Sequence, residues 1–358
     1  MPIVNVNIPR KEYKIHIHDS FNNLAEVVLD LCKGCKVMIV TDTNVDALFS
    51  QICMKEIEKA GSFPFKHVFP AGEENKNLKT VNEIYKSCLK NKFERDDVIL
   101  ALGGGVAGDM AGFVAATYMR GIKLIQVPTS VLAQCDSSIG GKVGVDFEGL
   151  KNVIGAFYQP KLIYINIATL KTLSKREYFS GFGEIVKHAV IRDASLFEYL
   201  ENNVEAIKAR DMKLLSTVIE KNCKIKSEVV TIDEREAGLR EILNLGHTIG
   251  HAVESEVDFS MPHGECVSIG IAGITNVAVR MGMLSVSDFN RIISLLQKFE
   301  LPVIYKGLDS DDIYSLMNLD KKVKNGKISY ILPVRIGEVR ITSDIDENII
   351  KEALHDIL

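Results

Sequence analysis

The stretch Val98-Ile-Leu-Ala-Leu-Gly-Gly-Gly-Val-Ala-Gly-Asp109 decides the fold that the sequence predicts. It begins with a short apolar run typical of a buried strand, and helical periodicity follows the glycines. A glycine-rich turn between a strand and a helix offers backbone N–H groups and the positive end of the helix dipole to a pyrophosphate. The spacing is not GxGxxG, and a tightly packed turn also uses glycine. Three successive glycines exceed what a turn requires, which favours phosphate binding.

Two similar apolar runs flank this stretch. Lys36-Val-Met-Ile-Val40 comes before it and Lys123-Leu-Ile-Gln-Val127 follows it. Both are short, and segments with helical periodicity fill the intervals. Strands that alternate with helices predict a parallel sheet covered by helices, in which ligands bind beyond the carboxyl ends of the strands.

The second half of the chain has a different character. Long amphipathic segments, such as residues 194–207 and 212–230, dominate it, and few strand signals appear before residues 328–332. We therefore expect an α/β nucleotide-binding domain over residues 1–175 and a mainly α-helical domain over residues 176–358. The active site is expected between the two domains.

The composition suits a folded protein with two cores. The chain has 358 residues, of which 46% are hydrophobic. Lys and Arg number 43 against 47 Asp and Glu, and the net charge of −4 argues against a general nucleic-acid or anionic-membrane binder. No stretch has the apolar length of a membrane span, and residues 1–14 lack the apolar centre of a signal peptide.

The seven cysteines are an odd number scattered over the chain. Such a set suits reduced thiols in the cytoplasm better than a disulfide framework. Cys32 and Cys35 form a lone CxxC, for which incidental thiols in a turn are favoured over zinc or redox chemistry.

Asp42 follows the first apolar run, in Thr41-Asp-Thr-Asn44. A carboxylate at that point could accept both hydroxyls of an adenosine ribose. It would equally cap a following helix, and the residues alone favour the cap.

Residues 128–146 are dense in hydroxyl groups and glycines and hold one lysine, Lys142. This composition suits the enclosure of a polar ligand, because buried polar groups need partners. Lys151, Asn152 and Arg120 add donors nearby in the sequence. Each of them alone is more often a surface residue, so only their convergence would indicate a site.

Histidines form a second candidate constellation. His247 and His251 stand at i and i+4, which places them on one helical face at a spacing that zinc sites use. The pair lacks the glutamate of the HExxH metalloprotease signature. His263 and Glu184 are further candidate ligands, and capping or core roles remain the alternative on spacing alone.

Together these blocks resemble the 3-dehydroquinate synthase family, within the sugar-phosphate cyclases. They follow the family's order and leave mainly the two ends of the chain unmarked. The matching motifs are GGGVAGD at 103–109, the run 128–144, KNVIGAFYQP at 151–160, GFGEIVKHAVI at 181–191, DEREAGLREILNLGHTIGHAVE at 233–254, HGE at 263–265 and DKK at 320–322.

The resemblance implies one active site that performs several steps on 3-deoxy-D-arabino-heptulosonate 7-phosphate, in the shikimate pathway to aromatic amino acids. Bound NAD+ oxidises a ring hydroxyl to a ketone, phosphate leaves by β-elimination, NADH returns the hydride, and the ring opens and recloses by an intramolecular aldol addition. The transient ketone is needed because an unactivated C–H group is too weak an acid for a protein base.

For the metal, the resemblance implies Glu184, His247 and His263 as ligands of Zn2+, with Co2+ as another suitable ion. This set displaces the pair suggested by spacing, since His251 becomes a substrate-binding or proton-transfer residue. Two histidines and one carboxylate leave coordination positions for substrate, as a catalytic zinc requires.

For the substrate, the resemblance implies a set of cations and amides. A phosphate and a carboxylate need several fixed positive groups, which explains how a chain of negative net charge could serve an anionic substrate. Arg120 would reach the phosphate from the neighbouring subunit of a homodimer, and Lys321 or Lys322 could add a cation. The other matching positions are Lys142, Asn152, Lys187, Lys226, Arg240, Asn244 and His251.

For the nucleotide, the resemblance implies that Asp42 binds the ribose rather than only capping a helix. Its charge would repel a 2′-phosphate, so NAD is expected rather than NADP. The matching positions are Asp42, Asn44, Gly72, Glu73, Lys76, Gly104, Gly105, Val106, Asp109, Thr129, Ser130, Asp136, Lys142, Lys151, Thr169, Leu170, Lys171, Thr172 and Glu177.

The sequence departs from the family's usual pattern at four positions. Ser130 replaces a more usual Thr, Cys135 an aliphatic residue, Asp146 an Asn and Ser174 a Pro. None of these changes removes an implied metal ligand or cation.

Three alternatives share these motifs. A cyclase for another sugar phosphate would not need contacts to a substrate carboxylate. A metal-dependent NAD polyol dehydrogenase would release NADH and would not need the implied lysines. A noncatalytic NAD-binding regulator would have no reason to retain Glu184, His247 and His263 together.

Overall fold

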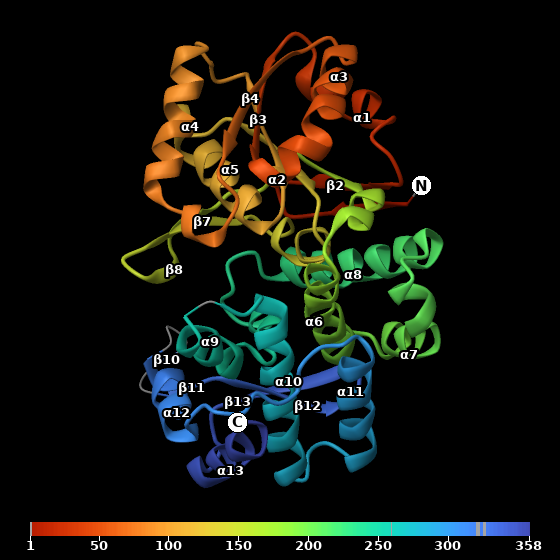
Figure 1. Cartoon of the computed structure of the whole chain (residues 1–358), viewed down its shortest axis with the longest axis vertical. Coiled ribbons are helices and arrows are strands. Elements are labelled where there is room, and N and C mark those ends of the chain that lie inside the picture. Colours follow the sequence, from red (N-terminus) through yellow and green to blue (C-terminus); the bar gives the residue numbers. More distant parts are fainter. Residues whose placement is uncertain (1, 259, 320–322, 325–326) are drawn as a thin grey trace. The chain divides into compact units, whose positions relative to one another are not determined.

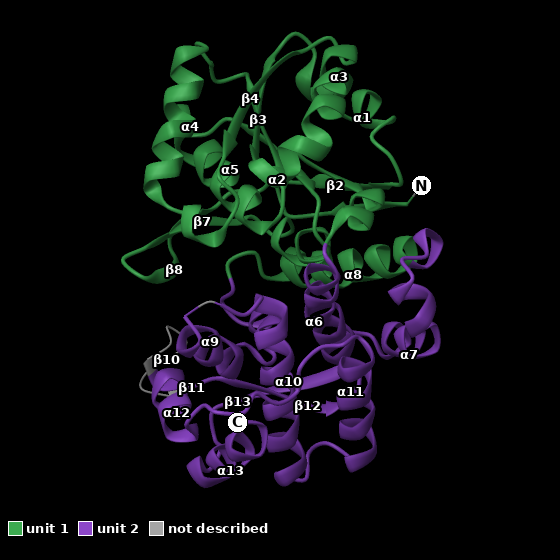
Figure 2. Ribbon diagram, viewed as in Figure 1, with its two compact units in different colours: residues 1–173, 215–235 green, residues 174–214, 236–358 purple. Residues whose placement is uncertain are grey.

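The chain is described by a computed structural model that covers residues 2–258, 260–319, 323–324 and 327–358. It forms two compact units. Unit 1 comprises Met1–Leu173 and Leu215–Arg235, and unit 2 comprises Ser174–Leu214 and Glu236–Leu358 (Figure 2).

A sheet lies at the centre of unit 1 (Figure 1). It has seven strands, in the order β1-β2-β9-β6-β5-β3-β4. Neighbouring strands are parallel except β1, which pairs with β2 antiparallel. The three apolar runs that predicted strands lie in β3, β5 and β6, and the parallel sheet is confirmed. The strands are β1 (Ile3–Val6), β2 (Tyr13–His18), β3 (Lys36–Asp42), β4 (Phe63–Phe69), β5 (Val98–Gly103), β6 (Lys123–Pro128) and β9 (Leu162–Asn166).

Helices cover both faces of this sheet. α4 (Leu78–Lys90) and α5 (Gly105–Thr117) pack in one hydrophobic core, and α1 (Leu24–Cys32) and α3 (Gln51–Lys59) pack in another. Alternate residues of β3 divide between the cores, since Met38 and Val40 belong to the first and Val37 and Ile39 to the second. Each such fully buried aliphatic side chain contributes about 1.5–3 kcal/mol to stability. A strand buried on both faces explains why its sequence is continuously apolar.

A hairpin of β7 (Lys142–Phe147) and β8 (Leu150–Phe157) forms a separate two-stranded sheet in unit 1. Phe147, Leu150, Val153 and Phe157 leave 39% to 56% of their surfaces exposed. The hairpin therefore presents apolar side chains that this chain does not cover.

The predicted helix at 212–230 is confirmed as α8 (Met212–Ile232), and from Leu215 on it packs with unit 1 (Figure 2). Asn222 Nδ2 donates to the carbonyl oxygen of Cys135 over 2.8 Å, within the π-helical segment η4 (Ala133–Ser137). The domain boundary expected after residue 175 stays a prediction, because the compact units are not continuous in sequence. In the structure the chain first changes unit between Leu173 and Ser174 and returns to unit 1 for residues 215–235.

Unit 2 is mainly helical, as predicted. α10 (His263–Arg280) contacts α6 (Lys175–Arg192), α9 (His247–Glu256), α11 (Val286–Lys298) and α13 (Glu347–Ile357). The unit also holds α7 (Ala194–Lys208), α12 (Ser310–Leu319), a small pair of β10 (Val323–Lys324) and β11 (Lys327–Ile328), and a hairpin of β12 (Tyr330–Arg335) and β13 (Glu338–Thr342). Among the helices that the structure describes, none combines the length and hydropathy needed to cross a membrane.

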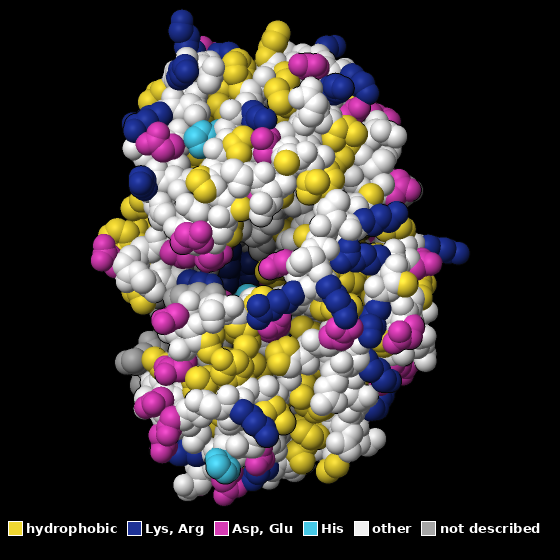
Figure 3. All heavy atoms as spheres, viewed as in Figure 1, with side chains coloured by type: hydrophobic (Ala, Val, Ile, Leu, Met, Phe, Trp, Pro, Cys, Tyr) yellow, Lys and Arg dark blue, Asp and Glu magenta, His cyan; other side chains and the backbone are white. Residues whose placement is uncertain are grey.

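The surface carries charges of both signs. On the face drawn in Figure 3, Lys and Arg side chains lie intermixed with Asp and Glu. This distribution agrees with the near balance of charges in the sequence, and any basic site has to be local.

Candidate active site

Glycines bring α6 and α10 of unit 2 into close contact. A Cβ atom on Gly183 would lie 2.3 Å from the carbonyl oxygen of Gly264, and one on Gly264 would lie 1.8 Å from that of Ser180. No side chain larger than hydrogen fits at either position. Because Glu184 follows Gly183 and His263 precedes Gly264, the contact holds a carboxylate near an imidazole.

A second glycine contact joins α9 to α10. A Cβ on Gly270 would lie 1.9 Å from the carbonyl oxygen of Gly246. Gly246 has a φ of +76°, which glycine adopts without strain, and it directly precedes His247, the first residue of α9. This contact fixes the start of α9, and His247 with it, against α10.

Glu184, His247 and His263 converge. Oε1 of Glu184 lies 3.4 Å from Nε2 of His247 and 3.4 Å from Nε2 of His263. Tetrahedral Zn2+ ligands with bonds of about 2.0–2.1 Å stand about 3.3–3.4 Å apart, so these separations match a metal site. Both oxygens of Glu184 are buried, and Oε1 faces the Nε2 atoms of the two histidines without a hydrogen bond of normal geometry. The donor atoms that are present therefore fit a divalent metal.

Lys187, one turn along α6 from Glu184, places its ammonium in contact with Glu184 Oε2. Burial raises the pKa of Glu184, but the charge of Lys187 and the neighbouring His247 outweigh it and hold that pKa well below its usual value. Burial and the charge of Lys187 lower the pKa of His247 to about 3. Glu184 is thus a carboxylate and His247 a neutral imidazole, the forms that bind metals.

The other ring nitrogens of the two histidines have acceptors. His247 Nδ1 lies 3.2 Å from the carbonyl oxygen of Leu245, and His263 Nδ1 lies 3.2 Å from Oε2 of Glu254. Because a carbonyl and a carboxylate only accept, each Nδ1 donates, and Nε2 is the atom that faces Glu184. Burial lowers the pKa of His263, but its contacts with Glu184 and Glu254 outweigh burial and raise that pKa to about 9, so Nε2 of His263 has to lose its proton when it binds a metal. Sequence reasoning missed Glu254, although its position two turns after His247 on α9 gives it the same helix face.

His251 lies beside these residues. His247, His251 and His263 each offer a nitrogen, and the three nitrogens lie within 4.8 Å of one another. The structure thus brings together the pair that spacing suggested and the third histidine. The set that contains Glu184 suits a cation better than three neutral imidazoles, because its carboxylate supplies charge.

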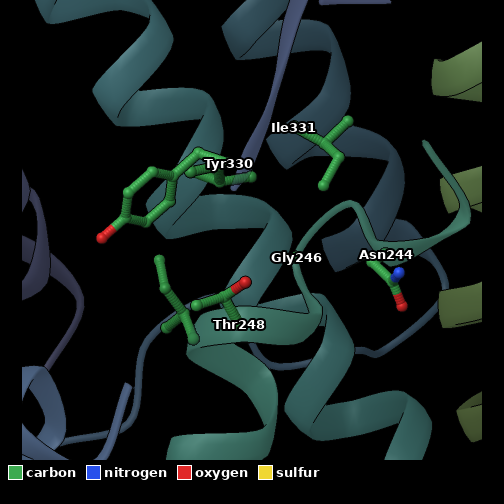
Figure 4. Close-up of a pocket in the computed structure, with 7 residues that line it drawn as sticks. Asn244, Gly246, Thr248, Tyr330 and Ile331 are labelled. Atoms are coloured by element: carbon green, nitrogen blue, oxygen red, sulfur yellow. The ribbon is translucent and has the colours of Figure 1, made fainter. Parts of the chain in front are cut away.

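Arg240 and Asn244 lie in η6 (Leu239–Asn244), just before α9. Arg240 is buried, and Asn244 Nδ2 donates to Glu236 Oε1 over 2.7 Å. Sequence reasoning also missed Glu236, which stands in the matched 233–254 motif. Asn244 lines a small pocket with Thr248 of α9 and Tyr330 of β12 (Figure 4).

In unit 1 the glycine run lies where it was predicted, at the turn from β5 into α5. A Cβ on Gly104 would lie 3.6 Å from Oγ of Ser130, and one on Gly105 would lie 3.3 Å from Oγ of Ser137. Backbone N–H groups and hydroxyls therefore surround the start of α5, at the carboxyl end of a central strand. These groups fit the pyrophosphate of a dinucleotide.

Asp42 caps a helix, as one of its two interpretations predicted. Its Oδ1 accepts from the N–H groups of Asn44 over 2.8 Å and of Val45 over 3.1 Å, at the start of α2 (Thr43–Val45). Its Oδ2 would lie 3.5 Å from a Cβ on Gly103. The cap thus uses one oxygen while the other faces the glycine turn, so the ribose contact stays a compatible prediction.

Lys76, Asp109 and Asn152 form a polar cluster in unit 1. Lys76 Nζ lies 2.7 Å from Asp109 Oδ2 and donates to Asn152 Oδ1 over 2.5 Å. Burial raises the pKa of Asp109, and Lys76 opposes that rise. The N–H of Asn152 donates to Asp146 Oδ1 over 2.7 Å, a contact that an Asn at 146 would also provide. Lys76 and Asp109, both candidate nucleotide-binding residues, thereby hold the side-chain amide of Asn152, a candidate catalytic residue, in place.

Lys226 and Asp136 are paired within unit 1. Lys226 Nζ donates to the backbone oxygen of Asp136 over 2.6 Å and to its Oδ1 over 2.5 Å. Lys226 is buried, so the pair fixes the end of its side chain.

The remaining candidates spread over both units. Lys151 Nζ lies 3.7 Å from Glu73 Oε1, and Gln134 Nε2, which sequence reasoning missed, donates to Thr169 Oγ1 over 3.1 Å. Lys321 and Lys322 lie outside the described residues. Gly72 directly precedes η2 (Glu73–Asn75), which Glu73 begins, and Arg120 is exposed in η3 (Tyr118–Arg120). Val106 lies in α5, Thr129 follows β6, Lys142 begins β7, and Thr169 to Thr172 end η5 (Ile167–Thr172). Glu177 lies in α6 of unit 2.

Comparison with known proteins gives the same family over both halves of the chain. Residues 66–180 match the family model described as 3-dehydroquinate synthase N-terminal, and residues 181–323 match the one described as 3-dehydroquinate synthase C-terminal. The chain is 47% identical over 352 residues to the 3-dehydroquinate synthase of Acetivibrio thermocellus, an alignment that covers 98% of each chain.

Solved structures of two cyclases resemble the fold. The 2-epi-5-epi-valiolone synthase of Streptomyces hygroscopicus, solved with NAD+ and Zn2+, is 26% identical with a TM-score of 0.89 over 96% of each chain. A 2-deoxy-scyllo-inosose synthase, solved with carbaglucose-6-phosphate, NAD+ and Co2+, is 25% identical with a TM-score of 0.91 over 100% of each chain. The family models, the sequence identity and the shared α/β and helical units agree, and the chain belongs to the 3-dehydroquinate synthase family.

Proposed function

We propose that this chain is a lyase that converts 3-deoxy-D-arabino-heptulosonate 7-phosphate to 3-dehydroquinate and phosphate, with NAD+ and a divalent metal as cofactors. The observation that carries the proposal is the donor set of Glu184, His247 and His263, which has metal-ligand spacing. The 47% identity to a 3-dehydroquinate synthase over 98% of both chains supports the choice of substrate.

Glu184, His247 and His263 would hold the metal. A divalent ion supplies a Lewis acid when it is bound, which polarises an alcohol or carbonyl oxygen. The chain contributes the orientation of the ligands, because Leu245 and Glu254 accept from the Nδ1 atoms of the two histidines. The Zn2+ and Co2+ in the two solved cyclases support these ions as candidates.

The glycine turn would bind the nucleotide. NAD+ supplies a hydride acceptor when it is bound, and it is restored within the catalytic cycle. Gly104 and Gly105 let the backbone approach the pyrophosphate, and the start of α5 offers it N–H groups. Asp42 would accept the ribose hydroxyls through Oδ2, and its charge would disfavour a 2′-phosphate.

The candidate substrate residues favour an anionic substrate over a simple alcohol. Lys142, Asn152 and Lys226 belong to unit 1, and Lys187, Arg240, Asn244 and His251 belong to unit 2. The lysines and Arg240 would hold the phosphate and the carboxylate, and His251 would move a proton. A polyol dehydrogenase needs no such set of cations, so this composition supports the cyclase.

We also propose a homodimer in which Arg120 serves the neighbouring subunit. Arg120 is exposed, with a φ of +65° between Met119 and Gly121, whose φ values are also positive. The exposed apolar residues of the β7–β8 hairpin support an interface, because a second copy would remove them from water.

The free cysteines support a reducing compartment, and we propose the cytoplasm.

The proposal is tested with purified enzyme, metal, the heptulosonate phosphate and less NAD+ than substrate. We expect phosphate release in excess of NAD+, without lasting absorbance of NADH. NADH that accumulates in proportion to consumed substrate would instead identify a dehydrogenase. Intact substrate in the presence of both cofactors would contradict the proposed function.

A cyclase for another sugar phosphate is the second candidate, since both solved neighbours are named for other products. The two candidates differ in whether the substrate carries a carboxylate that the enzyme has to bind. Arg240→Ala should reduce turnover of the heptulosonate phosphate more than it reduces stability. Equal activity of the wild type on glucose 6-phosphate or sedoheptulose 7-phosphate, which lack the carboxylate, would favour the second candidate.

A further inference from the structure

The turn that carries Lys142 is held by contacts that the proposed chemistry does not use. Gly140 and Gly141 have φ values of +95° and +70° and directly precede Lys142, the first residue of β7. The N–H of Gly140 donates to the hydroxyl oxygen of Tyr13 over 3.3 Å, and the N–H of Tyr158 donates to the carbonyl oxygen of Gly141 over 2.7 Å. These bonds fix the backbone from which the lysine side chain extends.

The amide of Gln159 packs directly on this turn. A Cβ on Gly141 would lie 2.6 Å from Nε2 and 2.9 Å from Oε1 of Gln159, so the amide occupies the space beside the Cα atom. Gln159 is 8% exposed. In an interior packed this closely, a shift of the amide has to move the turn.

Glu234 sets the orientation of that amide. Gln159 Nε2 donates to Glu234 Oε1 over 3.1 Å, and a carboxylate only accepts, so the amino end of the side chain faces Glu234. The same oxygen of Glu234 lies 2.7 Å from Lys11 Nζ. Burial raises the pKa of Glu234, but its bonds with Lys11 and Gln159 outweigh it and lower that pKa, which keeps the acceptor ionised.

We propose that Gln159 is a positioning residue for Lys142, and that Glu234 and Lys11 hold Gln159 in place. The inference rests on the proposed function, which gives Lys142 its role toward substrate and nucleotide. Lysine has a long stem with many rotamers, so its charge is placed reproducibly only if its backbone origin is fixed. Lys11 lies in the β1–β2 loop, Gln159 just after β8 and Glu234 just after α8, all within unit 1.

The first test compares single variants of the full-length holoenzyme. Gln159→Leu removes the donor at similar volume and should lower kcat about tenfold to hundredfold, the scale of an effect from a small misplacement of a catalytic group. Glu234→Gln keeps an acceptor oxygen but loses the charge, so it should lower kcat less. Glu220→Gln is the matched control, because it removes an ion pair of 2.6 Å with Lys224 on the same helix and should leave kcat unchanged.

The second test is a double-mutant cycle with Lys142→Ala, accompanied by thermal unfolding of every variant. If Gln159 acts through Lys142, Gln159→Leu has no further effect on the residual kcat of Lys142→Ala. An equal loss in both backgrounds, or a kcat of Gln159→Leu equal to that of Glu220→Gln, overturns the inference and leaves the proposed function standing. A wild type that leaves the heptulosonate phosphate intact overturns both.

Discussion

The ammonium of Lys187 touches Oε2 of Glu184, while Oε1 of the same carboxylate lies 3.4 Å from the Nε2 atoms of two histidines. One buried carboxylate thereby joins a candidate substrate-binding cation to the candidate metal ligands. A buried ion pair adds little net stability, because the loss of hydration offsets the attraction, but loss of one partner leaves a buried charge alone.

Glu184→Gln should therefore destabilise the metal-free protein by about 3–5 kcal/mol, the usual cost of breaking a buried pair. The double variant Glu184→Gln, Lys187→Met should recover part of that loss. Denaturant unfolding measures both. Glu205→Gln is the control, because its pair with Lys208 is largely exposed on the glutamate side and should change stability by less than about 1 kcal/mol. A single variant as stable as the wild type would contradict the assignment of the pair.

Removal of metal by a chelator should abolish turnover and leave the chain folded. The glycine contacts that hold α6, α9 and α10 together do not depend on an ion, so circular dichroism should stay close to that of the metal-loaded protein. Zn2+ or Co2+ should restore turnover. Activity that persists after metal analysis has verified removal would rule out the metal site.

Asp42→Ala and Asp42→Asn should separate the two roles of this residue. Asp42→Ala removes the capping oxygen and should cost about 1 kcal/mol of stability, whereas Asp42→Asn keeps an oxygen for the cap. Both should weaken NAD+ binding and narrow the discrimination against NADP+, because the carboxylate charge is gone. Calorimetric titration with each dinucleotide measures the effect. If Asp42→Asn discriminates between NAD+ and NADP+ as well as the wild type does, Asp42 only caps the helix.

The stability conferred by Glu234 should depend on pH. Its pKa in the folded chain is lowered, so it stabilises the protein above its unfolded pKa of about 4.3, and this contribution is lost as the pH falls through the folded pKa. The stability difference between wild type and Glu234→Gln should thus shrink as a neutral solution is acidified below that value. Urea unfolding at several pH values tests this, and a difference that grows on acidification would contradict it.

The cysteines should react unequally with an alkylating reagent. Burial raises the pKa of the Cys53, Cys88 and Cys223 thiols to about 12, and that of Cys32 likewise to about 12. Among the seven, Cys35 is partly exposed and the other six are buried. Native protein treated with iodoacetamide should be labelled at Cys35 first, as peptide mass spectrometry can show. Rapid labelling of Cys32 as well would point to a reactive CxxC instead.

Much of the fold follows from local pattern. The runs around Val40, Leu102 and Val127 are apolar because strands buried on both faces touch helices on both sides, and that burial is visible in the sequence. The sequence does not show in the same way which part of the chain α8 packs against. Its amphipathic pattern shows that one face is buried, but the contacts of Asn222 and Lys226 with residues 135 and 136 span about ninety positions.

The candidate site shows the same division. Spacing paired His247 with His251, the residues also offered His263 and Glu184 as further candidates, and the resemblance selected Glu184, His247 and His263 as the ligands. The proximity of these side chains depends on close helix contacts at glycines such as Gly183 and Gly264, which pattern analysis of single helices does not reveal. Glu254 and Gln159 escaped prediction because each acts on a partner that no local pattern identifies.

The assignment of residues 215–235 to unit 1 has a consequence for biosynthesis and for protein engineering. A ribosome has to deliver more than half of the polypeptide, and with it part of the other unit, before the first unit possesses all of its helices. A truncated product that stops near residue 175 would lack Lys226, Glu234 and the helix that seats them, so the two halves of this enzyme should not survive separation by a single cut.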